Sequence, residues 1–317
     1  MKEFIYNQDK LDDMSIDIDL ITKEVHEPND YYGQANILRK YCKYPFSMKA
    51  VYEHSLPFHD IIWHVDMNSK CLIAFVSSIH RFKVYKSNKI KKIVFNIGSI
   101  LNYVINDSVF DEVSKKITRS GSVYFPPHST HHIKSNVNNL LIIDKLNNLP
   151  EKFHPISVCM YWKDVQNGNH KIYLDNGFQV ISAGHIYDKM FYYRLYDILR
   201  RFNYSLGSSF GSFVFHSARS GSKVYFPEIL RIKEAYEVST KNFEDPELES
   251  RLKFVSKFED QAISLFSDEN INYSDDQIKF IEYYSSSKLY SKGKLFCILL
   301  FADFLYVFRN LAKKIIK

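Results

Sequence analysis

Three groups of small and polar residues follow apolar runs of the sequence and have the side chains to bind an anion. In the first group, His128, Ser129 and Thr130 come after two prolines, which turn the backbone sharply out of the preceding run. An imidazole, two hydroxyls and exposed backbone N–H groups at the end of a strand suit a phosphate group. A proline-fixed loop with solvated polar residues would have the same composition, so this alternative stays open.

The second group is the segment ISAGHIYD, residues 181–188. Gly184 allows a tight turn after an apolar run, and this turn would present His185 at the end of a strand. A histidine in that position can donate a proton to a leaving phosphate or orient a base, and Asp188 can cap the next helix. The alternative is a histidine that bonds a loop carbonyl.

The third group is a turn of small residues before an apolar helix. Ser208, Ser209 and Ser212 offer hydroxyls and backbone N–H groups close to the predicted helix N-terminus, and Gly211 permits the close approach of a ligand. The same serines would also suit a helix cap that binds no ligand.

A carboxylate and an imidazole, Glu53 and His54, end an earlier run, AVYEH. Such a pair can act as a general base toward an acceptor hydroxyl. A structural pair is an equally good interpretation. Gly33 lies inside a helix that we expect to begin near Pro28, which indicates the close approach of a ligand or of another backbone segment.

Several other chemistries lose support. The sequence has no G-x-x-x-x-G-K-[ST] or H-E-x-x-H motif, which argues against P-loop kinases and zinc proteases. The D-x-D letters at Asp17 and Asp19 lie in an acidic stretch with no preceding strand, so we expect no metal site and no cofactor there. The four cysteines lack C-x-x-C spacing, and the first twenty residues lack an apolar signal region, so we expect a cytoplasmic protein with free thiols.

The charge balance is mildly basic. Lys and Arg exceed Asp and Glu by six, but they are spread along the chain and form no stripe, so we expect no nucleic-acid partner. Anionic ligands or an anionic membrane surface are compatible with this balance.

The polar groups follow runs that indicate strands. Apolar and β-branched runs alternate with amphipathic stretches, which indicates βα units with mostly parallel sheets. Ligands of such sheets bind at the carboxyl ends of the strands, where the polar groups lie. The expected strands are within residues 50–54, 71–78, 92–99, 122–130, 156–162, 178–185, 204–209 and 223–226.

The length of 317 residues suggests two domains of roughly 150 residues each. We expect an N-terminal domain over 1–119, a second domain over 120–227 and a helical extension over 228–317, which has one glycine and no histidine. Within the extension, the apolar run Leu295–Phe308 is shorter than the ~20 residues of a spanning helix and precedes basic residues. The segment 295–317 is therefore expected either at a membrane interface or docked on the protein core.

The motifs together resemble bacterial sugar transferases of surface-polysaccharide synthesis, which build capsule, O-antigen and lipopolysaccharide. The resemblance covers residues 26–226, and its more specific motifs are AGH-x-x-D and P-x-H-S-T. The motifs in order are YYGQANILRKY, VYEHS, KIVFNIGSILNYV, SVYFPPHST, ISVCMYWKDV, FQVISAGHIYD and the small-residue turn. The resemblance implies an α/β, GT-B-like fold in which two Rossmann-like domains face a cleft.

The resemblance also implies a metal-independent glycosyltransferase. The second domain would bind a nucleotide-activated sugar, and the first would bind a glycan or a lipid-linked glycan, with peripheral contact to the inner membrane. Carried over by position, the residues that would face the donor are His128, Ser129, Thr130, Gly184, His185, Asp188, Ser208, Ser209, Gly211 and Ser212. Glu53 and His54 would face the acceptor, and these two with His185 would be catalytic. The alternatives are a GT-B-like nucleotide-sugar epimerase or hydrolase, and a non-catalytic scaffold.

Overall fold

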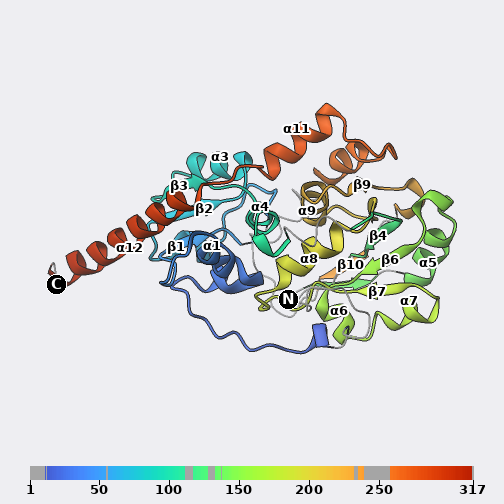
Figure 1. Ribbon diagram of the computed structural model, residues 1–317, viewed down its shortest axis with the longest axis horizontal. Helices are drawn as coiled ribbons and strands as arrows, with labels where there is room; N and C mark the ends of the chain where they lie inside the picture. The colour runs from blue at the N-terminus through green and yellow to red at the C-terminus, as the bar shows by residue number, and fades with distance from the viewer. Residues whose placement is uncertain are drawn as a thin grey trace. The chain divides into compact units, whose positions relative to one another are not determined.

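The chain folds into two compact α/β units, as a computed structural model shows (Figure 1). The residues described are 11, 13–54, 56–110, 117–127, 133–136, 138–231, 235–238 and 258–315. The described residues of 1–18, 109–186 and 190–278 form what we call the five-stranded unit. Those of 19–108, 187–189 and 279–317 form the three-stranded unit.

The three-stranded unit is built on a parallel sheet of order β1-β2-β3, with β1 at Ala50–Tyr52, β2 at Ile73–Val76 and β3 at Ile93–Asn96. Apolar side chains of β1, β2 and β3 pack against Val84 and Tyr85 and form the core beside this sheet. The helices of this unit are η4 (Glu27–Gly33), α1 (Gln34–Cys42), α2 (His64–Asn68), α3 (Ile79–Ser87), α4 (Ile100–Ile105) and α12 (Lys292–Ile315).

The five-stranded unit contains a wholly parallel sheet of order β7-β6-β4-β8-β9. Its strands are β4 (Ser122–Phe125), β6 (Ile156–Cys159), β7 (Gln179–Ile181), β8 (Tyr204–Gly207) and β9 (Lys223–Tyr225). The elements around it are η3 (Asp13–Ser15), α5 (Asn139–Asn147), η7 (Glu151–Phe153), α6 (Trp162–Gln166), α7 (Lys171–Asp175), α8 (Phe191–Leu199), α9 (Phe213–Arg219) and η8 (Glu228–Leu230).

The predicted α/β class is confirmed. Each of the eight expected runs contains a strand, and all eight strands pair in parallel. Apolar, β-branched and aromatic residues form these strands because parallel sheets bury both faces under helices. Val123, Val158 and Leu206, on three of the five neighbouring strands, are fully buried.

The strand order of the larger sheet contains a reversal. From β4 at the centre, the chain adds β6 and then β7 on one side, and afterwards returns to add β8 and β9 on the other side. The connections that follow β4 and β8 therefore lead away in opposite directions. Such a reversal is a topological switch point, and it lies between β4 and β8.

The C-terminal segment departs from the predicted helical extension. The described residues of 228–278 belong to the five-stranded unit and those of 279–317 to the three-stranded unit, and α11 (Asp275–Tyr284) connects the two units along the chain. The segment also contains a strand, β10 (Ala235–Val238), which pairs antiparallel with β5 (Ile133–Asn136). Both strands were missed because each pairs only with a strand that is distant in sequence.

Other boundaries also follow tertiary packing. The chain passes from the three-stranded to the five-stranded unit between Ser108 and Val109, where the sequence placed a boundary near 119. The described N-terminal residues up to Ile18 belong to the five-stranded unit. The start of α11 agrees with its local pattern, because Gln277 and Ser274 exchange the reciprocal hydrogen bonds of a capping box.

Candidate functional site

The switch point of the five-stranded sheet brings together two of the predicted polar groups. The carboxyl end of β4 leads into Pro126 and Pro127, and the neighbouring carboxyl end of β8 leads into Ser208. The Tyr124 hydroxyl on β4 lies 3.2 Å from Ser208 Oγ, which connects the two strand ends. His128, Ser129 and Thr130 lie outside the described residues.

The loop 208–212 is polar and open at its glycine. A Cβ added at Gly211 would meet only the Phe213 ring, at an ordinary contact distance of 3.4 Å. Ser209 and Ser212 are partly exposed, and the Ser212 side chain makes no capping hydrogen bond to α9. Ser212 thus lies at the N-cap position of α9, but its hydroxyl is not used to cap the helix end.

One amide of this loop already binds a carboxylate. The Phe210 N–H donates to Glu259 Oε1 at 2.6 Å, and burial raises the pKa of the Glu259 carboxyl. Glu259 lies in a helix over residues 258–265. A phosphate bound at this loop would therefore use hydroxyls and amides other than that of Phe210.

His185 lies at the same carboxyl edge, after β7. It is 3% exposed, its ring centroid is 3.9 Å from that of Trp162, and its Nε2 is 3.8 Å from Asp17 Oδ1. Gln166 donates to the other oxygen of Asp17 at 3.0 Å. Asp17 lies in an acidic stretch where we expected no site, yet the fold brings it to the predicted catalytic histidine. No local pattern signals this long-range contact.

The tight turn at Gly184 is confirmed, with a φ of 98°. A Cβ there would lie 2.6 Å from the guanidinium of Arg194, and Arg194 Nε donates to the Ala183 carbonyl at 2.9 Å. The turn therefore brings a guanidinium close to His185. Arg194 was missed because it lies within a predicted helix, where an arginine is ordinarily a solvated surface residue.

Asp188 belongs to the three-stranded unit, together with Tyr187 and Lys189. It does not cap α8, because that helix has Met190 as its N-cap and no side-chain capping bond. The same segment explains Gly33, since a Cβ at Gly33 would lie 2.6 Å from the backbone of Lys189. Of the two interpretations of Gly33, the structure supports the approach of another backbone segment.

Glu53 and His54 do not pair with each other. The Glu53 side chain is 1% exposed and accepts hydrogen bonds of 3.0 and 2.9 Å from Arg81 Nε, while Arg81 also donates to the Ile61 carbonyl. Burial raises the pKa of the Glu53 carboxyl, and the guanidinium opposes that shift. These contacts favour the structural interpretation of Glu53.

His54 has aromatic neighbours instead. Its ring lies edge-on to Tyr31, with centroids 5.1 Å apart, and stacks on Tyr32 with centroids 6.0 Å apart. Tyr31 in turn contacts Tyr187. The contacts of His54 thus involve tyrosine rings, while the Glu53 carboxylate of the predicted pair binds Arg81.

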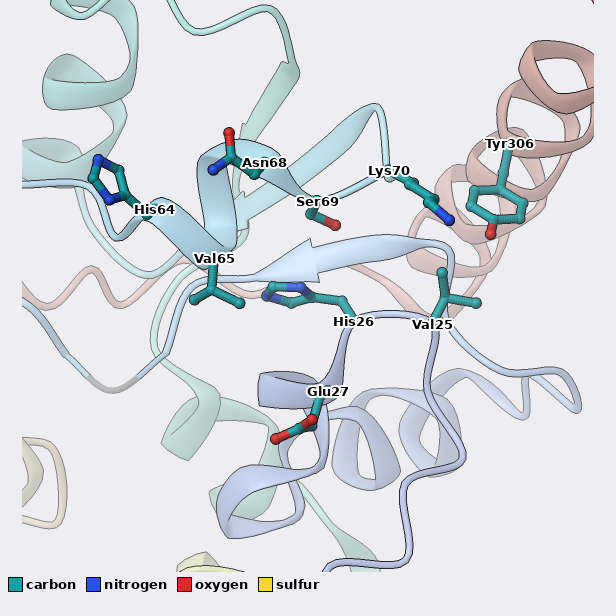
Figure 2. A pocket seen from close by; sticks show the side chains of 9 residues that line it. All are labelled: Val25, His26, Glu27, His64, Val65, Asn68, Ser69, Lys70 and Tyr306. Carbon is teal, nitrogen blue, oxygen red and sulfur yellow. The ribbon is translucent and has the colours of Figure 1, made fainter. Parts of the chain in front are cut away.

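An open pocket of about 470 Å³ lies in the three-stranded unit, and none of the predicted catalytic or donor-binding residues that the structure describes lines it (Figure 2). Its side chains come from the segment before η4, from α2 and the loop after it, and from α12. They are Val25, His26, Glu27, His64, Val65, Asn68, Ser69, Lys70 and Tyr306. His26 is oriented by a 2.8 Å contact between its Nε2 and the buried Asp66 carboxylate. Among the described residues, no group of three His, Cys, Asp or Glu side chains could hold a metal ion.

Comparisons with known proteins find distant structural similarity only. No protein-family model matches the chain, and no curated protein sequence matches it. Solved structures with some similarity include UDP-GlcNAc 2-epimerase of Methanocaldococcus jannaschii in complex with UDP-GlcNAc and UDP, with a TM-score of 0.36 and 10% identity over 66% of this chain and 57% of that one.

Two further structures are similar to the same degree. UGT73P12 of Glycyrrhiza uralensis, complexed with glycyrrhetinic acid 3-O-monoglucuronide, has a TM-score of 0.38 and 10% identity over 79% of this chain and 58% of that one. UDP-GlcNAc 2-epimerase of Neisseria meningitidis bound to UDP-GlcNAc has a TM-score of 0.37 and 13% identity over 83% and 70%. This chain thus spans less than two thirds of the first two proteins. The α/β class rests on the parallel sheets described above.

Proposed function

We propose that the five-stranded unit binds a nucleotide-activated sugar at the carboxyl edge of its sheet, and that the protein transfers this sugar to a glycan or lipid-linked glycan. The observation that supports the binding site is the strand order β7-β6-β4-β8-β9. Its switch point opens at the loop 208–212, and nucleotides bind in such crevices of parallel α/β sheets.

The polar groups at this edge suit a leaving nucleotide phosphate. Charge that develops on the departing phosphate would be stabilised by the hydroxyls of Ser209 and Ser212 and by the guanidinium of Arg194. His185 next to Asp17 would donate a proton or, in its protonated form, supply a second positive charge. This arrangement needs no metal ion, which agrees with the proposal of a GT-B-type, metal-independent transferase.

The resemblance of the motifs supports the finer part of the proposal. Transfer within bacterial surface-polysaccharide synthesis would place the protein in the cytoplasm, where nucleotide-activated sugars are made. The GT-B arrangement of two facing domains, and a glycan acceptor in the three-stranded unit, belong to the same proposal.

Calorimetry with UDP, GDP, CMP and dTDP on the full chain tests the binding site. We expect one nucleotide to bind, and we expect Gly211→Leu to weaken its binding by about tenfold or more, because the added side chain would occupy space beside the loop that the ligand needs. Gly293→Leu is the control, since a Cβ at Gly293 meets no neighbour and the residue lies outside the proposed site. Unchanged affinity in Gly211→Leu would contradict a site at this loop.

Product analysis with the sugar derivative of that nucleotide then separates the reactions. A transferase requires an added glycan or lipid-linked glycan before the sugar leaves the nucleotide. Turnover without any acceptor would instead indicate an epimerase or a hydrolase. If no nucleotide binds the wild-type protein, the scaffold alternative is favoured and the proposal fails.

A further inference from the structure

The helix α12 carries an exposed apolar surface, which we call the α12 stripe. Its residues recur at spacings of three and four, so they share one side of the helix. They are Leu300, Phe301, Phe304, Val307, Phe308 and Leu311, and their exposed fractions range from 42 to 63%. The rings of Phe304 and Phe308 stack with centroids 6.1 Å apart. An exposed apolar strip of this kind on one helix indicates an interaction surface.

The opposite side of α12 is fixed to the three-stranded unit. Leu295, Leu299 and Ala302 are buried, and the helix packs against α1. The Tyr44 hydroxyl contacts the Asp303 carboxylate. Further along the helix, Arg309 Nη1 donates to the Lys70 carbonyl at 2.7 Å. The contacts therefore extend over much of the helix, and the α12 stripe is the side that remains outside.

The charges of α12 complement an anionic partner. The helix contains five basic residues, Lys292, Lys294, Arg309, Lys313 and Lys314, and one acidic residue, Asp303. The Asp303 carboxylate accepts from Tyr44, on the side that packs against the unit. The α12 stripe itself contains no charged residue. An apolar stripe with basic residues toward both ends of its helix fits the interface of an anionic bilayer.

A neighbouring loop adds to this surface. Phe46 is 57% exposed, and its ring lies edge-on to Tyr44, which also contacts Phe296 of α12. Lys43, at the end of α1, is exposed as well. Phe46 and Lys43 thus add an exposed aromatic ring and an exposed ammonium group to the apolar and basic residues of α12.

By length and composition alone, Lys292–Ala312 could cross a membrane. Crossing would require Leu295, Leu299 and Ala302 to leave their packing against the unit, together with the contacts of Asp303 and Arg309. A helix that keeps these contacts offers only its outer side to lipid. The contacts therefore favour a helix that lies in the plane of the interface.

We propose that α12 docks the protein on the surface of an anionic phospholipid bilayer. The aromatic side chains of the α12 stripe enter the boundary between headgroups and acyl chains, and the positive charge toward both ends of α12 attracts lipid phosphates. This inference does not depend on the proposed sugar transfer, because it concerns a different unit and needs no nucleotide.

Co-sedimentation of the full chain with vesicles tests the proposal. We expect about tenfold stronger binding to phosphatidylcholine vesicles that contain phosphatidylglycerol than to phosphatidylcholine alone, and weaker binding in high salt. The double variant Phe304→Ser/Phe308→Ser should lose about tenfold in affinity. The matched control, Leu140→Ser/Ile278→Ser, removes two comparably exposed apolar side chains of other helices and should bind as the wild type does.

Any of four outcomes would overturn the proposal. One is equal binding by the α12 double variant and the control. Another is binding that does not depend on anionic lipid. The third is resistance to extraction at alkaline pH, which would indicate a spanning helix. The far-UV circular dichroism of each variant shows whether it folds, and sedimentation velocity shows whether the α12 stripe instead joins two copies of the chain, which would also contradict membrane docking.

Discussion

The two parallel sheets both end their strands in polar residues, but they use them differently. In the three-stranded unit, Glu53 after β1 is bound by Arg81, and the Ser78 hydroxyl after β2 caps α3 by accepting from the Arg81 amide. In the five-stranded unit, the Ser212 hydroxyl makes no capping bond to its helix, and a Cβ at Gly211 would meet only the Phe213 ring. A polar residue at the end of a strand therefore indicates a ligand only where its side chain is not already bound by another part of the protein.

Topology explains part of the difference. The described strands of the smaller sheet follow one another in chain order, β1-β2-β3, whereas the order of the larger sheet reverses between β4 and β8. Adjacent connections that depart in opposite directions leave a crevice at the strand ends, while connections that depart in one direction cover them. The strand order of the larger sheet therefore indicates a binding site more strongly than any single side chain does.

The largest effect that the comparison predicts is on stability, at Glu53. Glu53→Gln removes one partner of a buried ion pair and leaves Arg81 uncompensated, which should lower the free energy of unfolding by about 3–5 kcal/mol. Urea unfolding of the wild type and of Glu53→Gln measures this difference in the free energy of unfolding. Glu53→Gln/Arg81→Met should recover part of the loss. If Glu53→Gln is as stable as the wild type, the carboxylate is not structural, and its role as a general base regains support.

A second prediction concerns His216, a buried residue of the five-stranded unit away from the strand ends. Burial lowers the pKa of its imidazole from 6.5 to about 4. Between pH 6.5 and 4, the His216 imidazole therefore binds a proton in the unfolded chain but not in the folded protein. Stability should be complete above pH 6.5 and fall by about 3 kcal/mol between pH 6.5 and 4.

The pH dependence of urea unfolding measures this loss. His216→Gln should abolish this part of it, because the amide does not titrate. An unchanged slope in His216→Gln would assign the pH dependence to other groups. It would also weaken the distinction between the interior of the five-stranded unit and its polar edge.

The smallest predicted effect compares a glycine of each unit. Gly98 in the three-stranded unit has a φ of 84°, and a Cβ there would lie 1.9 Å from the Lys288 carbonyl oxygen. Gly98→Ala should cost about 2 kcal/mol, whereas Gly211→Ala should change stability by less than about 0.5 kcal/mol. Thermal or urea unfolding of both variants measures these two changes in stability. Equal costs would show that the loop 208–212 is packed as tightly as the turn at Gly98.

Local patterns predicted much of the fold. The runs that became strands have β-branched and aromatic residues that favour extended backbone, and the reciprocal bonds of Ser274 and Gln277 join residues only three apart. The turn at Gly184 was also predictable, because only glycine readily adopts its φ. The strands β5 and β10 were not, since each becomes a strand only through its distant partner.

The sequence by itself determined where the eight parallel strands and the turn at Gly184 form, because these depend mainly on interactions within a few residues. It could not determine that Glu53 would meet Arg81, that Asp17 would meet His185, or which side of α12 would remain exposed. Those outcomes depend on which elements become neighbours after folding. Burial and charge pairing act between side chains that are far apart in the chain, so only the tertiary structure separates groups that stabilise the fold from groups available to a ligand or a membrane.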